Sequence, residues 1–243
     1  DDKTVAIEQL NGFLLHRRAY RETSYLVSIF TLERGRVSAV VKGVRGSKSD
    51  KKSLLQPFQP LLINVSGKHE LKNLQQVEST ASRFGLTAQA LFSAMYLNEV
   101  LTRLLGVEIP QPEIFSLYQH SLHALTAGGE IEPILRQFEL GLLDELGYGL
   151  DLAHDSDSGE LLASDCYYQL ISEQGLRAVS SKTSSPYYFS GSVLLQVASG
   201  QWNKSSLHCA KRITRSALTQ LLGSKPLTSR ELFKQTHFTS KGR

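Results

Sequence analysis

Cysteine is scarce in this chain, which holds only Cys166 and Cys209 among its 243 residues. The two do not form a CxxC pair, and they lie in separate parts of the sequence. A disulfide scaffold is denser in cysteine than this, and a structural zinc site uses closely spaced pairs of thiolates or imidazoles. We therefore predict a protein without disulfide bonds, bound metal or cofactor.

Long apolar runs are also missing. No segment approaches the ~20 consecutive apolar residues that cross a bilayer. The N-terminal stretch DDKTVAIEQLNG is polar and lacks the apolar middle region of a secretory signal. We expect a cytoplasmic protein with no membrane partner.

Familiar catalytic motifs are absent as well. The sequence has no GxxxxGK[ST], GxSxG or HExxH motif. His120 and His123 are one helical turn apart, but no third metal ligand follows nearby, and we interpret them as helix-surface residues. Asp155 and Asp157 beside His154 could hold a cation, and we interpret them as a solvated acidic loop. We predict that the chain is not an enzyme and rank a hydrolase with a scattered site below the binding functions.

The net charge of +4 hides an uneven distribution of charge. Residues 1–80 hold 13 Lys and Arg against 8 Asp and Glu, residues 81–175 hold 3 against 14, and residues 176–243 hold 11 against 1. Two basic ends around an acidic middle indicate that part of the chain binds a polyanion. The alternative is that the acidic middle packs against the basic segments of the same chain.

One basic segment, RGRVSAVVKGVRGSKSDKK (34–52), joins a β-branched run to a loop rich in lysine, glycine and serine. A flexible cationic loop at the end of a strand can follow a phosphate backbone and release its counterions. An ordinary solvated hairpin loop has a similar composition. We predict that the following residues bind nucleic acid: Arg34, Arg36, Lys42, Arg45, Lys48, Lys51 and Lys52.

Short apolar and β-branched runs, separated by turn signals, predict five strands in the N-terminal third. Their spacing of roughly ten residues predicts a small barrel or sandwich. Five strands fit the OB-fold, but spacing alone does not distinguish it from an SH3-like barrel. The predicted strands are residues 12–17, 24–31, 36–42, 60–65 and 71–77.

From residue 86 the apolar period becomes that of helices, so the predicted fold class is α+β. Glycines and prolines punctuate four predicted helices, at residues 91–105, 112–125, 133–146 and 205–222. Consecutive helices with short connections imply a helical bundle. The intervening segment is polar and acidic, and residues 166–179 predict a small hairpin around Glu173-Gln174-Gly175.

The last predicted helix carries a basic stripe beside its apolar face. Lys204, His208, Lys211 and Arg215 are spaced i, i+4, i+7 and i+11, and Arg212 lies beside them. Such a stripe can bind an acidic amphipathic peptide or a phosphate backbone. The alternative is internal pairing with acidic residues of the third predicted helix, namely Glu132, Glu139, Asp144 or Glu145.

Segments that span nearly the whole chain resemble, in the same order, the RecO family of bacterial DNA recombination and repair mediators. The two most specific are LRQFELGLLDELGYGLDL (135–152) and GSKPLTSRELF (223–233). The others are RETSYLVSIFTLERGRVSAVVKGVRGSKS (21–49), LLQPFQPLLI (54–63), MYLNEVLTRLL (95–105) and CAKRITRSAL (209–218).

The resemblance implies an N-terminal OB-fold domain at 1–80, a helical domain at 81–150 and 186–243, and a small zinc-binding module inserted at 151–185. It implies a non-enzymatic, nucleoid-associated protein that binds single- and double-stranded DNA and anneals complementary strands. The implied partners are the acidic C-terminal tail of the single-stranded-DNA-binding protein and RecR, with which it helps load RecA on coated strands.

The chain departs from the family in the inserted module. Many members carry two CxxC pairs there, whereas this sequence has Asp155 and Ser158 at the first pair and residues near Ala178 and Ser181 at the second. Cys166 alone cannot build a zinc site, so we expect a metal-free remnant.

The resemblance also implies residues that hold the acidic tail. Arg136 matches a family position of this kind, whereas His208 stands where close relatives have an arginine, and a neutral imidazole binds a carboxylate more weakly. The predicted tail-binding set is Arg136, His208, Lys211, Arg212 and Arg215. Aromatic residues of the barrel could stack on DNA bases or pack in the core, and the candidates are Phe13, Tyr20, Tyr25 and Phe30.

Overall fold

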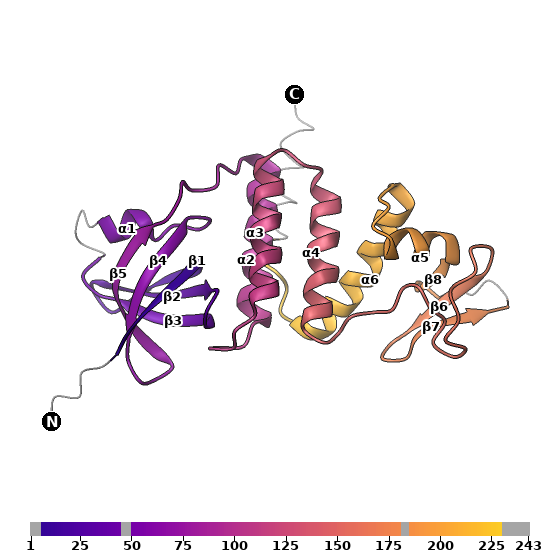
Figure 1. The fold of residues 1–243 in the computed structure, drawn as a ribbon, viewed down its shortest axis with the longest axis horizontal. Coiled ribbons are helices and arrows are strands. Elements are labelled where there is room, and N and C mark those ends of the chain that lie inside the picture. Colours follow the sequence, from indigo (N-terminus) through magenta and orange to yellow (C-terminus); the bar gives the residue numbers. More distant parts are fainter. Residues whose placement is uncertain (1–5, 45–49, 181–184, 230–243) are drawn as a thin grey trace. The chain divides into compact units, whose positions relative to one another are not determined.

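The computed structural model describes residues 6–44, 50–180 and 185–229. Its N-terminal part is a closed barrel with the strand order β1-β2-β3-β5-β4, in which only the β3–β5 pair is parallel (Figure 1). The strands are β1 (Ile7–Tyr20), β2 (Ser24–Thr31), β3 (Gly35–Val41), β4 (Pro60–Ser66) and β5 (Leu71–Ser79). A short helix, α1 (Asp50–Leu54), joins β3 to β4. This is the OB-fold, so the predicted barrel and the α+β class are confirmed.

The barrel closes because β1 is long enough to pair with two neighbours. Ile7–Phe13 pairs with β4, and Gly12–Tyr20 pairs with β2. A bulge between Leu14 and His16 bends the strand where it passes from one partner to the other. Gly12 lies at this crossing, where a Cβ atom would come within 2.5 Å of the Phe30 carbonyl oxygen. Alternating residues of every strand fill the barrel with a buried aliphatic core.

The chain forms two compact units, and each is described by itself. Among the described residues, the first unit comprises residues 6–129 and 225–229, and the second comprises residues 130–224. The first unit therefore contains the barrel and the helices α2 (Ala88–Leu104) and α3 (Pro112–Thr126). The predicted domains, at residues 1–80, 81–150 with 186–243, and 151–185, separate the barrel, the helices and the inserted module. These domain boundaries remain a prediction.

Aromatic side chains attach α3 to the outside of the barrel. The Phe13 ring lies 5.4 Å from that of Tyr118, and the Phe30 ring lies 5.2 Å from that of Phe115. The Tyr118 hydroxyl donates a 2.6 Å hydrogen bond to the Asn98 side chain on α2, and burial raises the pKa of Tyr118. Phe13 and Phe30 are thus core residues rather than base-stacking residues.

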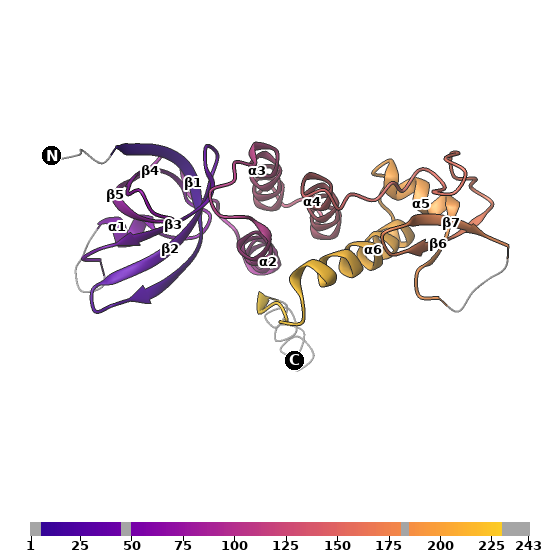
Figure 2. The ribbon, with the colours of Figure 1, turned by 90° about the horizontal axis from the view of Figure 1, so that it is seen from below.

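The second unit packs helices on a small sheet. Its elements are α4 (Ile131–Glu145), β6 (Tyr167–Ile171), β7 (Gly175–Val179), β8 (Tyr188–Ser190), α5 (Gly191–Ala198) and α6 (Lys204–Leu222). The sheet is antiparallel with the order β7-β6-β8, and its three strands are labelled in Figure 1. Figure 2 shows β6 and β7 from below. Asn203 and Ser206 form a capping box that starts α6. The core joins the sheet to α5 and α6 through Tyr168, Leu176, Phe189, Leu194 and Ile213.

The predicted hairpin is present as β6 and β7, and the four predicted helices correspond to α2, α3, α4 and α6. The short elements α1, β8 and α5 were not predicted. Within the described part of the chain, no helix combines the length and apolar character of a membrane-crossing segment.

Candidate functional site

Several basic segments meet at one end of the barrel. The Val44 amide donates to the Thr23 carbonyl at 2.8 Å, which ties the segment after β3 to the β1–β2 turn. The Arg17 guanidinium on β1 donates to the Leu55 carbonyl at 2.7 Å, and Lys51 on α1 donates to the Gln75 carbonyl at 2.8 Å. The β1–β2 turn, residues 42–44 and α1 therefore lie together, and we call this region the basic end of the barrel.

The outer face of β1, β2 and β3 at this end combines cations with an aromatic ring. Arg18 pairs with Leu26, and Leu26 pairs with Val40, so these side chains share one face. Tyr20 and Lys42 continue the same face two positions along their strands, and both line a hollow of about 410 Å³. We call Arg18, Tyr20, Leu26, Val40 and Lys42 the barrel face.

The structure brings together only part of the predicted nucleic-acid set. Lys42 is exposed on the barrel face, and Lys51 and Lys52 lie half-buried on α1. Arg45 and Lys48 lie outside the described residues.

Arg34 and Arg36 lie at the opposite end of these strands from Lys42. Arg34 forms two hydrogen bonds with Glu8, at 2.6 and 2.8 Å, and these hold the pKa of the Glu8 carboxyl below its usual range. Arg36 donates to the Leu105 carbonyl at 3.0 Å. Both guanidinium groups thus have internal partners, and their predicted contacts with nucleic acid remain predictions.

Sequence reasoning missed the basic residues of β1 and the turn that follows it. The segment HRRAYR (16–21) supplies Arg17, Arg18 and Arg21. Arg17 lies 5.2 Å from the centre of the Tyr25 ring, and Arg21 lies 5.2 Å from the centre of the Tyr20 ring. The signal was the interleaving of arginine with tyrosine, which is typical of surfaces that bind single strands.

The predicted tail-binding residue Arg136 is buried on α4. Its NH2 atom lies 2.9 Å from a Glu139 carboxylate oxygen, and the other Glu139 oxygen accepts a 2.5 Å hydrogen bond from Thr214 on α6. The Arg136 Nε–H has no hydrogen-bond partner among the described residues. Arg136 therefore belongs to an internal network between α4 and α6, and it retains one unpartnered donor.

The basic stripe of α6 borders a groove of about 540 Å³. Lys204, His208 and Lys211 are exposed, and the Arg212 guanidinium lies 4.7 Å from the centre of the Phe189 ring. The groove is lined by Glu132, residues 188–190, Val193, Lys204, Ser205, residues 207–209, Lys211 and Arg212. Arg215 is exposed farther along the helix and does not line this groove.

Few of the basic residues of this stripe form ion pairs with acidic residues of α4. Among the described residues, Lys211 is its one member with an ion pair to α4, to Glu132 at 3.4 Å. Both side chains are more than half exposed, and such pairs contribute little to stability. The groove thus keeps an excess of positive charge facing solvent.

The residues of the inserted module do not fit zinc. Asp155 is buried, and one of its carboxylate oxygens accepts hydrogen bonds from the amides of Asp157 and Ser158 at 2.8 and 3.0 Å. The other oxygen accepts from the Ala178 amide at 2.8 Å. The carboxylate therefore ties residues 155–158 to β7, and amide donors already occupy its oxygens. These hydrogen bonds, that of Ser158 first, lower the pKa of Asp155.

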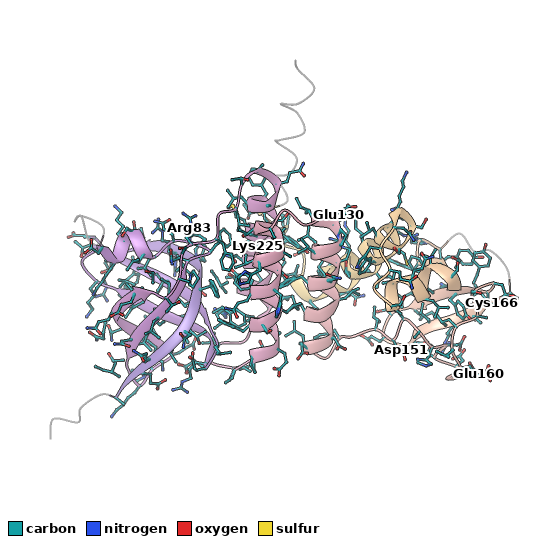
Figure 3. All side chains as sticks on the ribbon, turned by 45° about the horizontal axis from the view of Figure 1, so that its top comes forward. Arg83, Glu130, Asp151, Glu160, Cys166 and Lys225 are labelled. Atoms are coloured by element: carbon teal, nitrogen blue, oxygen red, sulfur yellow. The ribbon has the colours of Figure 1, made fainter. Side chains whose placement is uncertain are left out.

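The remaining candidate metal ligands are scattered. Within residues 6–44, 50–180 and 185–229, no three His, Cys, Asp or Glu side chains form a group that could hold a metal ion. Burial raises the pKa of Cys209 to about 12, which keeps it a neutral thiol, whereas zinc binds the thiolate. Cys166 is exposed and lies apart from Asp151 in the module (Figure 3). His154 pairs with Asp151, at 2.9 Å, rather than with Asp155 or Asp157.

The barrel and the unit that follows it define an OB-fold protein with a C-terminal helical region. The family described as recombination protein O N terminal matches residues 6–83, and that described as recombination protein O C terminal matches residues 86–231. The DNA repair protein RecO of Pseudoalteromonas atlantica is 66% identical over 98% of this chain and 99% of its own length. RecO of Pasteurella multocida is 46% identical over 92% and 93%. The chain belongs to the RecO family of DNA repair proteins.

Proposed function

We propose that this chain is a DNA-binding recombination mediator. It binds single- and double-stranded DNA at the basic end of the barrel and anneals complementary strands. Together with RecR it helps load RecA on DNA coated by the single-stranded-DNA-binding protein, and it does so without enzymatic turnover. The observation that carries this proposal is the placement of Arg18, Tyr20 and Lys42 on one outer face of an OB-fold.

The physical support comes from the position and composition of the barrel face. OB-folds bind oligonucleotides on the face of strands 2 and 3 and on the loop between strands 1 and 2. Leu26 and Val40 lie on strands 2 and 3, Arg18 lies beside them on strand 1, and Tyr20 ends strand 1 at this loop. Cations neutralise phosphates and release counterions, while an aromatic ring stacks on any base. This combination suits a mediator that must bind DNA regardless of sequence. The α1 lysines extend the same basic end.

The groove on the second unit supports the acidic tail of the single-stranded-DNA-binding protein as a partner. Carboxylates of such a tail would contact Lys204, Lys211 and Arg212, and its apolar side chains would contact the groove floor. Arg136 does not line the groove and belongs to an internal network with Glu139 and Thr214, so we assign it the role of positioning α6 through Glu139. The groove alone favours a second candidate function, an acidic-peptide-binding module without direct DNA function.

Titration of labelled single-stranded DNA at several salt concentrations separates these two functions. The double variant Arg18→Ala with Lys42→Ala should reduce the slope of log K against log salt by ~0.7 for each lost phosphate contact. The matched control, Arg83→Ala with Lys225→Ala, removes two exposed charges away from the barrel face and should leave the slope unchanged. Equal slopes for both variants would refute the proposed DNA site, and an absence of DNA binding by the wild type would favour the peptide-binding module.

A further inference from the structure

The helix α6 borders two hollows of the second unit, and no residue lines both of them. The groove described above lies along the basic stripe of α6. A larger hollow, of about 1120 Å³, lies along a different stripe, formed by Ile213, Ser216, Ala217, Gln220 and Leu221. These residues are spaced i, i+3, i+4, i+7 and i+8, so they share one face of the helix, and none of them is charged. We call this second space the large hollow.

The other walls of the large hollow come from the segment that follows α4 and from the β6–β7 hairpin. Leu170 and Leu176 of the hairpin, together with Leu150, supply apolar surface. The Gln220 side-chain amide donates to the Ser172 hydroxyl at 3.2 Å, which ties α6 to the hairpin. Every wall thus belongs to the second unit, so the hollow is complete within that unit.

The charged residues of the large hollow are acidic. Among the described residues, neither lysine nor arginine lines it, whereas Asp151, Asp155 and Glu173 do. Backbone amides already bind the Asp155 carboxylate, and Asp151 (Figure 3) pairs with His154 at 2.9 Å. Hydrogen bonds, that of the Ala153 amide first, hold the pKa of Asp151 below its usual range, so this carboxylate is ionised at pH 7. Glu173, in the turn of the hairpin, is exposed and has no ion pair within the described part of the chain.

The size of the hollow and the pairing of its strands indicate what kind of occupant fits. Its volume exceeds the ~300–1,000 Å³ of most small-molecule sites, which favours a segment of a protein. The two strands that line it already have partners on both sides. β6 pairs with β7 and β8, and the turn at residues 155–159, which we call the Asp155 turn, is bonded to β7 through the Ala178 amide. An occupant must therefore bind through its side chains, and an amphipathic helix binds in this way.

We propose that the large hollow docks a basic, amphipathic helix of a partner protein. The apolar stripe of that helix packs on the leucines of the hairpin and on the uncharged stripe of α6, and its lysine or arginine residues lie near Asp151 and Glu173. DNA and an acidic peptide would each bring negative charge to these carboxylates, so neither ligand proposed above suits this place. The proposal therefore adds a third binding surface, and it does not depend on the barrel face or on the groove.

Titration of the full chain with two synthetic peptides tests whether the surface recognises an amphipathic helix. The first probe is a fluorescent peptide of leucine and lysine in which the leucines form one helical stripe. The second has the same composition in an order that destroys the stripe, and it should bind about tenfold more weakly. Equal binding of the two probes would show attraction between charges alone and would overturn the proposal.

Two variants test whether the striped probe binds in the large hollow. Ala217→Arg places a cation in the middle of the uncharged stripe of α6 and should weaken the probe by about tenfold or more. Glu173→Asn removes the exposed charge, and asparagine tolerates the φ of 60° at this position, so we expect a loss of a few fold with the turn intact. Glu113→Gln, an exposed position on α3, is the matched control and should retain full binding.

The outcomes distinguish this surface from the groove. Lys204→Ala with Lys211→Ala should not weaken the striped probe, and a loss of binding in that variant would place the helix in the groove and overturn the proposal. Circular dichroism establishes that each variant is folded, and if Ala217→Arg is not, Glu173→Asn decides. Probe affinity equal to that of the wild type in the folded variants of the hollow would refute the proposal.

Discussion

The two sheets of this protein differ in whether their edge strands are paired. The barrel closes on itself through β1, so all its strand edges are paired and recognition there depends on side chains. In the sheet of the second unit the Asp155 turn is bonded to β7, whereas no strand or turn is bonded to the outer edge of β8 among the described residues, so β8 can offer backbone groups. A closed barrel can bind a phosphate backbone, because this requires only positive side chains and no particular alignment with the strands. An open strand edge can bind a peptide, because its unpaired N–H and C=O groups form hydrogen bonds with a second main chain.

The two regions also differ in how they are held together. A fully buried aliphatic core and an aromatic cluster hold the barrel and α3. The small module in the second unit depends on one carboxylate, that of Asp155, which accepts hydrogen bonds from three backbone amides.

Phe30→Ala should destabilise the first unit by about 3–5 kcal/mol, the usual cost of removing a fully buried phenylalanine ring. The ring is 0% exposed and contacts Phe115 and Tyr118. Denaturant unfolding of the full chain measures the loss. Tyr20→Ala, on the half-exposed barrel face, should instead keep stability and weaken single-stranded DNA by about 1–3 kcal/mol for one lost stacked base. The reverse result would restore Phe30 as a base-stacking residue.

Asp155→Asn should destabilise the inserted module by about 2 kcal/mol, because it removes the charge from a buried carboxylate that accepts three hydrogen bonds from backbone amides. The pKa of Asp155 is lowered in the folded state, so the carboxylate stabilises the fold fully above about pH 4 and loses this effect as the pH falls through the folded-state pKa. The difference from wild type should therefore be large at pH 7 and shrink toward pH 2. Hydrogen exchange of the Ala178 and Ser158 amides measures the local opening.

The exposed Asp165 offers a matched control in the same module. Asp165→Asn should leave exchange of the Ala178 amide unchanged. Elemental analysis of wild-type protein purified without chelator should also give well under one zinc per chain. A stoichiometric zinc, lost in Asp155→Asn, would mean that the carboxylate is a metal ligand rather than an acceptor for backbone amides.

The sequence predicted the barrel strands well because alternation and turn residues are local signals. Predicted and observed bounds agree within a few residues except at β1, which was predicted at residues 12–17 and extends over Ile7–Tyr20. The polar sequence at its beginning and the bulge after Leu14 interrupt the alternation of apolar and polar residues, so the full length of the strand was not recognised. The elements α1 and β8 are too short to show a helical or strand periodicity of apolar residues, so they could not be predicted. The helix α5 (GSVLLQVA) lacks a polar face, because most of it packs in the core.

The candidate site was harder to predict because it depends on where strands end. Residues 34–52 are continuous in sequence, yet Arg34 and Lys42 lie at opposite ends of the strands they flank. Arg18 lies far from Lys42 in sequence, and only the pairing of β1 with β2 and of β2 with β3 places them on one face. Burial of Arg136 beside Glu139 was likewise invisible, although the i, i+3 spacing of the two residues was present in the sequence.

His208→Arg provides the finest test of the difference between the two regions. The residue is exposed on α6, where it lines the groove together with Lys204, Lys211 and Arg212. A permanent guanidinium charge there should strengthen binding of an acidic peptide, such as one in which Asp alternates with Val, by a few fold, about 0.5–1 kcal/mol. The gain should fade at high salt, since the site is open to solvent. His208→Gln, which introduces no permanent charge, is the control and should show no such gain. DNA affinity of the barrel face should be the same in all three proteins, and a parallel gain in DNA binding would show that the groove and the barrel serve one polyanion rather than two ligands.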